Sequence, residues 1–320
     1  MPRTLLFDEN GVPFKIETKI VAKQPSNSLV WTNLRAGDDI RQILPMIVDR
    51  SMAFTEDLLE EQRPRIQTYQ TLEDNDETFT VVVLSIPTED IFKSDDFTFQ
   101  VSFVLLKDQI FSVVSRESSI FSEIMSKLIA KKEQHTLTSC FKYLISELLE
   151  NAISTMDQVE DFIDHSERRM LQGGVKKGWL ASLLGLKGKL FDSIKLVKAD
   201  IEHIRELKMG IVPEINTEEI GDHLEDRGLF LLDEVEAHRE DLTNLINLHL
   251  AIASNIMNKQ FYWLAIIGSI LIIPTIISSI YGMNVDLPDI NFWELIGLIT
   301  LLTVMASFVI RYFLPKPILG

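Results

Sequence analysis

The chain has 320 residues, of which 46% are hydrophobic, and it carries a formal net charge of −16. This acidic balance excludes the basic footprint that nucleic-acid phosphates require, so we expect no nucleic-acid partner. The single cysteine, Cys140, excludes an intramolecular disulfide and any multi-thiolate metal site, which suits a reducing cytoplasm. The first residues contain no apolar stretch typical of a signal peptide.

The N-terminal part of the chain alternates between β-rich runs and helical patterns. This order predicts an α/β sandwich domain over residues 1–137. The turn signal Lys107-Asp108 separates two of its strands. The expected strands cover residues 15–22, 28–34, 78–86, 97–106 and 109–115, and the expected helices cover residues 38–57 and 118–132.

An apolar stripe with a period of 3.6 residues begins near residue 138 and predicts a helix to residue 171. A second helix is expected from about residue 181 to 209, after the break at Gly173-Gly174. The two predict an antiparallel helical hairpin within residues 138–216. Its connecting segment is basic and apolar. It is either an ordinary solvated tip or a surface for lipid or a neighbouring subunit.

A third and much longer helix is expected from Thr217, acting as its N-cap, to Tyr281, since no proline interrupts the chain before Pro274. At about 1.5 Å per residue, this helix would be on the order of 95 Å long. Its narrow apolar seam requires partner helices, which favours a bundle of several copies of the chain. We divide it into a stalk helix, 217–260, and a first membrane span, 261–281.

Two apolar stretches near the C-terminus can cross a hydrocarbon core of roughly 30 Å as helices. The first is 261–281 and the second, with its flanks, is 292–313. The external loop 282–291 joins them, and a tail, 314–320, follows. The loop contains acids but no Lys or Arg, whereas basic residues flank the other ends of the spans, so both termini should be cytoplasmic. The predicted fold class is α+β: the sandwich domain, the hairpin, the stalk and two membrane helices.

Small and polar residues recur along the first span at spacings that place them on one helical face. In membrane proteins such a stripe often packs against other helices. Alternatively it lines a pore, which chains with two spans each can enclose only as a ring. In the pore interpretation, the lining residues are Asn258, Leu264, Gly268, Ile272, Thr275 and Ser279.

The first span ends in Tyr281-Gly282-Met283-Asn284, which resembles the signature of the CorA family of divalent-cation channels. Arg63-Pro64-Arg65, ahead of a strand-like run, is also similar to the soluble domain of that family. The resemblance implies a homopentamer in the inner (plasma) membrane that passes Mg²⁺, with Co²⁺ or Ni²⁺ as secondary ions. It implies an external mouth formed by Gly282, Met283 and Asn284. Neutral amide oxygens there suit an ion that sheds its water reluctantly.

The resemblance also implies cytoplasmic carboxylates that bind Mg²⁺ and hold the closed state. The matching positions are Asp76, Asp222 and Asp226, each of which could instead belong to a solvated acidic face. His223 stands where relatives often carry an acid, and the tail has only two basic residues, Arg311 and Lys316.

Nothing in the sequence indicates an enzyme. The chain has no phosphate-binding loop, and its six histidines lack metal-ligand spacing. Transport should therefore be passive. A zinc carrier of the same superfamily is one alternative, although Met283 favours the magnesium interpretation. A membrane-anchored oligomeric sensor or interaction protein is another, in which the spans are only anchors.

Overall fold

The computed structural model describes residues 2–20, 28–35, 64–70, 78–92, 97–114, 119–172, 178–283 and 290–313. The chain divides into two compact units, Met1–Leu245 and Ile246–Gly320. The fold class is α+β as expected, with a mixed sheet, a large helical part and two C-terminal candidate membrane helices.

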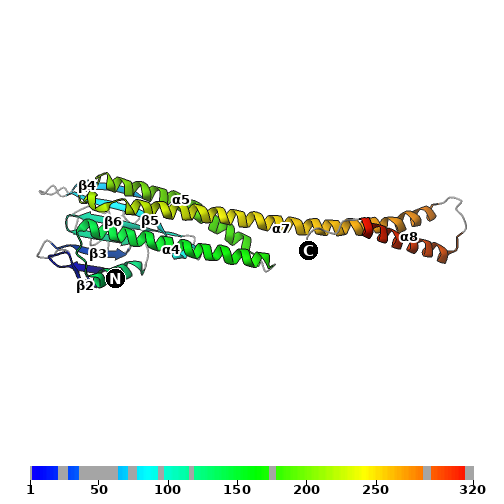
Figure 1. Ribbon diagram of the computed structural model, residues 1–320, viewed down its shortest axis with the longest axis horizontal. Coiled ribbons are helices and arrows are strands. Elements are labelled where there is room, and N and C mark those ends of the chain that lie inside the picture. Colours follow the sequence, from blue (N-terminus) through cyan, green and yellow to red (C-terminus); the bar gives the residue numbers. More distant parts are fainter. Residues whose placement is uncertain are drawn as a thin grey trace. The chain divides into compact units, whose positions relative to one another are not determined.

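A seven-stranded sheet forms the centre of the first unit (Figure 1). Its strand order is β2-β1-β3-β7-β6-β5-β4, and only the β3–β7 pair is parallel among the described strands. The strands are β1 (Arg3–Phe7), β2 (Pro13–Glu17), β3 (Val30–Arg35), β4 (Arg65–Gln70), β5 (Thr78–Pro87), β6 (Thr98–Leu106) and β7 (Gln109–Val114), with a short 3-10 helix, η1 (Glu89–Phe92), after β5.

One face of the sheet packs against helices through aromatic side chains. Phe103 of β6 lies 5.3 Å, between ring centroids, from Phe141 of the helix α4 (Leu137–Leu171). Trp31 of β3 contacts Phe121 of the helix α3 (Ile120–Lys131) and donates its indole N–H to the Ser112 hydroxyl at 2.9 Å. The indole therefore combines a large buried apolar surface with a satisfied polar group.

The opposite face of the sheet carries a separate apolar cluster. Paired residues on neighbouring strands point to the same face, so alternate residues of β5, β6 and β7 gather there. Burial of branched and aromatic side chains on both faces explains the near-continuous apolar sequence of β5. The cluster consists of Leu34, Phe79, Val81, Val83, Val104, Phe111 and Val113.

Two long helices, α4 and α5 (Trp179–Lys208), occupy the region in which the helical hairpin was expected. α4 begins with a capping box in which the Thr136 hydroxyl accepts from Ser139 N and the Ser139 hydroxyl accepts from Thr136 N. α5 packs against β5. There the buried carboxyl group of Asp200 accepts from Ser85 N at 3.2 and 3.3 Å, two residues beyond the last β4–β5 pair.

The single helix expected from Thr217 to Tyr281 is wrong at its start. The structure has a short helix, α6 (Thr217–Ile220), and then α7 (His223–Tyr281). Gly221 separates them because its φ of +63° lies outside the helical region and favours glycine. The cap is Asn216 rather than Thr217, since the Asn216 side chain accepts from Glu218 N at 3.1 Å.

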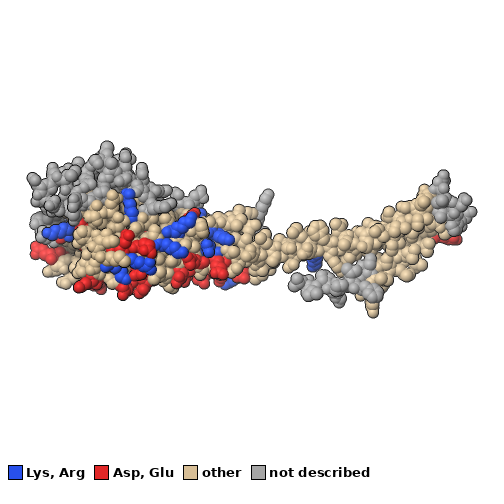
Figure 2. All heavy atoms as spheres, turned by 90° about the horizontal axis from the view of Figure 1, so that it is seen from above, with Lys and Arg blue, Asp and Glu red and all other residues tan. Residues whose placement is uncertain are grey.

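The second unit contains the C-terminal part of α7 and α8 (Phe292–Phe313), both long and apolar enough to cross a membrane. In Figure 2 the described surface of this unit is almost free of charged side chains, whereas both signs of charge crowd the first unit. The helix expected at residues 38–57 lies outside the described residues. β1 was not predicted, and β2 begins and ends earlier than the strand expected at 15–22.

Candidate functional site

Within the second unit, α8 covers only one face of α7. Ile273 and Ile277 of α7 line an apolar groove together with Leu302 and Ala306 of α8. Partly covered positions on α7 recur at steps of three and four, which keeps them on one side of the helix. Four of these positions are isoleucines, Ile266, Ile270, Ile273 and Ile277.

The predicted pore stripe lies on a different face of α7 and is exposed. Its large members, Leu264 and Ile272, are 65% and 58% exposed. At 100° per residue, Thr275 lies about 170° around the helix from the centre of the isoleucine face. α8 therefore leaves the stripe open to other helices or to water. All six predicted residues, Asn258, Leu264, Gly268, Ile272, Thr275 and Ser279, are exposed in the single chain.

Thr275 is oriented by its own helix. Its hydroxyl donates to the Leu271 carbonyl at 2.8 Å, so the oxygen keeps its lone pairs for other partners. An oxygen presented as an acceptor suits a hydrated cation, whose water molecules donate. Pro274, next to it, has no amide hydrogen, and the Ile270 carbonyl one turn earlier consequently lacks its usual intrahelical donor.

The end of α7 is built around Gly282. Gly282 N donates to Ser278 O at 3.0 Å, and Met283 N donates to Ile280 O at 3.2 Å. A Cβ at Gly282 would lie 3.2 Å from the Ser278 carbonyl oxygen, so a larger residue would crowd this last turn. Met283 is exposed. Asn284, the remaining residue of the predicted mouth, lies outside the described residues.

The predicted regulatory carboxylates fall at the beginning of α7. Asp222 directly precedes the helix with its side chain 83% exposed, and Asp226 lies one turn later, also exposed. Asp226 N donates to Asp222 O at 3.0 Å, which places the two residues one above the other. Asp76 lies outside the described residues. His223, which follows Asp222 in the sequence, accepts a hydrogen bond from Arg227 Nε at 3.0 Å.

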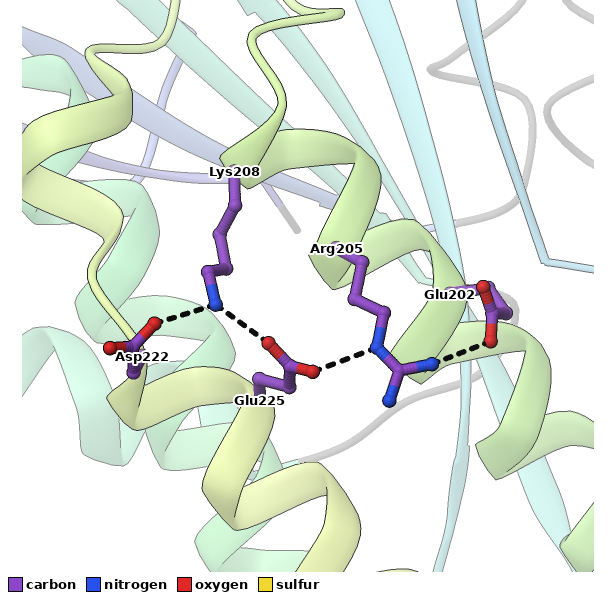
Figure 3. Close-up of polar contacts among 5 residues, drawn as sticks. All are labelled: Glu202, Arg205, Lys208, Asp222 and Glu225. Atoms are coloured by element: carbon purple, nitrogen blue, oxygen red, sulfur yellow. Dashed lines mark hydrogen bonds and ion pairs between the residues drawn. The ribbon is translucent and has the colours of Figure 1, made fainter.

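Four charged residues near Asp222 were not predicted from the sequence (Figure 3). Lys208, the last residue of α5, is 2.6 Å from both Asp222 Oδ1 and Glu225 Oε2. Arg205 Nε is 2.7 Å from Glu225 Oε1, and Arg205 Nη1 is 2.7 Å from Glu202 Oε1. We call these five residues the α5–α7 ion network.

The pKa shifts in the α5–α7 ion network follow from these contacts. The hydrogen bonds to Asp222 and then Glu225 raise the pKa of Lys208. The hydrogen bond from Lys208, followed in size by the one from Arg205, lowers the pKa of the Glu225 carboxyl. The bond to Glu225 raises the pKa of Arg205. All three groups are thus held in their charged forms near neutral pH.

A complete metal site is not found in the part of the chain that the structure describes, which holds no group of three or more His, Cys, Asp and Glu side chains placed to bind a metal ion. The carboxylates of Asp222 and Glu225 both contact the Lys208 ammonium. Oxygen ligands of this kind are those that Mg²⁺ prefers.

The family model described as CorA-like Mg²⁺ transporter protein matches residues 27–316, which is most of the chain. The chain belongs to the CorA family. This confirms the family suggested by the tetrapeptide at 281–284 and makes the protein a member of a family of membrane transporters for Mg²⁺ and Co²⁺.

Two curated CorA relatives cover most of the chain. The cobalt/magnesium transport protein CorA of Thermotoga maritima is 25% identical over 272 residues, which is 82% of this chain and 74% of that protein. The protein of the same name from Methanocaldococcus jannaschii is 23% identical over 264 residues, covering 79% of this chain and 80% of the relative.

Solved structures share the CorA fold. The complete CorA magnesium transporter of Methanocaldococcus jannaschii superposes with a TM-score of 0.77 at 21% identity, covering 97% of this chain and 96% of that one. The full-length CmaX protein gives a TM-score of 0.71 at 17% identity, covering 97% of each chain. At these identities the likeness shows the fold alone.

Proposed function

We propose that the protein is a passive, Mg²⁺-gated channel for divalent cations that works as a homopentamer. The supporting observation is the exposed stripe of α7. Its polar and small side chains face away from α8, where the described residues of a single chain offer them no partner from another helix. A ring of chains would bring five such stripes to a common axis, as two spans per chain require for a pore.

The proposed pathway begins at the outer mouth, with the Asn284 carboxamides and the backbone carbonyls of Gly282 and Met283. These neutral oxygens would bind the hydrated ion without stripping its water. Inward of Ser279, the Thr275 hydroxyl oxygens form a second polar ring. The exposed side chains of Ile272 and Leu264 would narrow the pathway and gate it by dewetting. Gly268 and Asn258 complete the lining.

The membrane potential would drive the ion, at about 2.3 kcal/mol per charge per 100 mV and twice that for a divalent cation. We assign the protein to the inner (plasma) membrane, with both termini in the cytoplasm. Mg²⁺ is the first proposed ion, and Co²⁺ and Ni²⁺ are secondary ions. Transport of this kind requires no catalytic residues.

A passive pathway must close when the cell is replete, and we propose that Mg²⁺ binding at Asp76, Asp222 and Asp226 holds the closed state. Asp222 and Asp226 are exposed and lie one turn apart at the start of α7. Since the described residues of one chain provide no complete metal site, the remaining ligands would come from Asp76 or from a neighbouring subunit.

Reconstitution into liposomes that contain a Mg²⁺-sensitive dye tests the proposal. The purified protein should admit Mg²⁺ when an inward-negative potential is applied, and Asn284→Ala should abolish this entry while leaving the oligomer intact. Asn291→Ala is a matched control at the end of the external loop. Its backbone carbonyl, which the substitution keeps, accepts from Leu295 N at 3.0 Å to begin α8.

Entry of Mg²⁺ through Asn284→Ala at the wild-type rate would remove Asn284 from the mouth. No entry of Mg²⁺, Co²⁺ or Ni²⁺ through the wild-type protein would defeat the channel proposal. In that case, Zn²⁺ entry would favour the zinc carrier, and the absence of any flux would favour an anchored sensor or interaction protein.

A further inference from the structure

Lys208 holds the position at which a divalent cation would meet Asp222. Its ammonium lies 2.6 Å from Asp222 Oδ1 and 2.6 Å from Glu225 Oε2, bridging the two carboxylates as a metal ion would (Figure 3). The Lys208 side chain is 27% exposed, and that of Asp222 is 83% exposed. Asp222 is therefore open to ions from solvent while its charge is already matched from within the chain.

Glu225 differs from Asp222 because it has a second cation. Arg205 Nε bonds the other carboxylate oxygen of Glu225 at 2.7 Å, and Glu202 in turn holds Arg205 Nη1 at 2.7 Å. If Lys208 moved away, Glu225 would keep Arg205. Asp222 would lose the cation that the described structure places beside it. Displacement of Lys208 therefore removes the neighbouring positive charge from Asp222 but not from Glu225.

Lys208 is also poised to move independently of the helix packing. It is the last residue of α5, and Met209 and Gly210 follow it outside the helix. The helices themselves are held together by other contacts nearby, including the close approach of Gly228 to Ile201. The Lys208 ammonium can therefore change partners without a rearrangement of α5 against α7.

We propose that Lys208 is a built-in competitor of Mg²⁺ at Asp222 and sets the Mg²⁺ concentration at which the cytoplasmic unit responds. The inference rests on the proposed regulatory role of Asp222. A Mg²⁺ ion that binds there must displace the ammonium or bind beside it against repulsion. The lysine consequently shifts the response to higher Mg²⁺ concentrations.

The size of the shift follows from Coulomb's law. A single positive charge about 5 Å from a divalent ion, in water and screened by physiological salt, weakens binding by about fivefold. Removing the charge of Lys208 should therefore lower the Mg²⁺ concentration at half-response by about that factor. The shift should shrink at high salt because both charges are near solvent.

The test measures protection of the full-length protein from limited proteolysis as Mg²⁺ is raised. Lys208→Gln should reach half-protection at about fivefold lower Mg²⁺ than wild type, and Lys208→Arg should stay at the wild-type value. Lys198→Gln is the matched control because Lys198 also pairs a carboxylate of α7 from α5, at 2.9 Å from Glu236 Oε1. It should leave the midpoint unchanged.

Asp222→Asn added to Lys208→Gln should abolish the gain, since the carboxylate for which Lys208 and Mg²⁺ compete is then gone. An unchanged midpoint in Lys208→Gln, with wild-type thermal stability, overturns the proposal, as does an equal shift in Lys198→Gln. If Mg²⁺ does not protect the wild type from proteolysis, protection that appears in Lys208→Gln supports the proposed competition. The absence of Mg²⁺ protection in both proteins overturns the proposal. Mg²⁺ entry into liposomes reports on the channel proposal separately.

Discussion

Gly228 sets how closely α7 approaches α5, and its replacement by alanine should destabilise the first unit. A Cβ at Gly228 would lie 2.9 Å from Ile201 Cγ1 and 3.8 Å from Ile204 Cδ1. Ordinary carbon contacts are about 3.5–4.0 Å, so the new methyl group would overlap Ile201. Cγ1 is close to the backbone, and the strain cannot be relieved by rotating the end of the side chain alone.

Two opposing terms determine the magnitude. Overpacking a core contact costs about 1–3 kcal/mol. Alanine in place of glycine inside a helix raises the free energy of unfolding by about 1 kcal/mol. Gly228→Ala should therefore lower the free energy of unfolding by about 1 kcal/mol. Gly188→Ala in α5, where a Cβ would have no neighbour within 4 Å, should raise it by about 1 kcal/mol. The difference between the two, about 2 kcal/mol, isolates the contact from the helix propensity.

Cys140 offers an assay confined to the first unit. It is the only cysteine in the sequence and is fully buried in α4, so a thiol reagent should modify it only after that unit opens. The rate of labelling at increasing denaturant would compare the variants in the full-length protein. Equal stabilities for Gly228→Ala and Gly188→Ala would refute the close approach. Ile201→Ala should cost less in the Gly228→Ala background than in wild type, by at least about 0.5 kcal/mol.

Thr275→Val should reduce Mg²⁺ entry into liposomes about tenfold, because it removes the ring of hydroxyl groups. The control Thr300→Val, which loses a similar 2.8 Å hydrogen bond on α8, should leave Mg²⁺ entry unchanged. Equal rates of Mg²⁺ entry in the two variants would place Thr275 outside the pathway. Burial raises the pKa of the Asp200 carboxyl, so the fold favours its protonated form. That stabilisation is complete below the ordinary pKa of about 3.9 and is lost as pH rises through the folded pKa. Asp200→Asn, which cannot ionise, should raise the melting temperature more near pH 8 than near pH 4; a constant difference would contradict this. Burial also raises the pKa of Cys140 to about 12, so alkylation of the folded protein near pH 8 should be negligible, and rapid labelling would show that the site is open.

The elements that could be predicted from sequence are those whose buried residues recur at a regular spacing. The apolar stripe of α4 and the β-rich run at β5 each bury one or both faces against a continuous core, so the pattern identifies the element. The break at Gly221 could not be predicted in the same way. Glycine costs a helix only about 1 kcal/mol, and its φ of +63° is decided by how α6 packs and is capped. The cap was expected at Thr217 and is Asn216, because the Asn216 side chain and not the Thr217 hydroxyl bonds Glu218 N.

The two candidate sites differ in predictability for the same reason. The stripe on α7 is a property of one helix, because residues three and four apart share a face whatever surrounds them, and the structure keeps all six on an exposed side. The partner of Asp222 depends on the separation and direction of two helices. Lys208 and Asp222 are joined by a turn and α6, and no period relates them. A carboxylate at the start of a helix can indicate a cation site in sequence. The lysine beside Asp222 could not be predicted in this way, because its position depends on where the neighbouring helix ends, and α5 ends at Lys208.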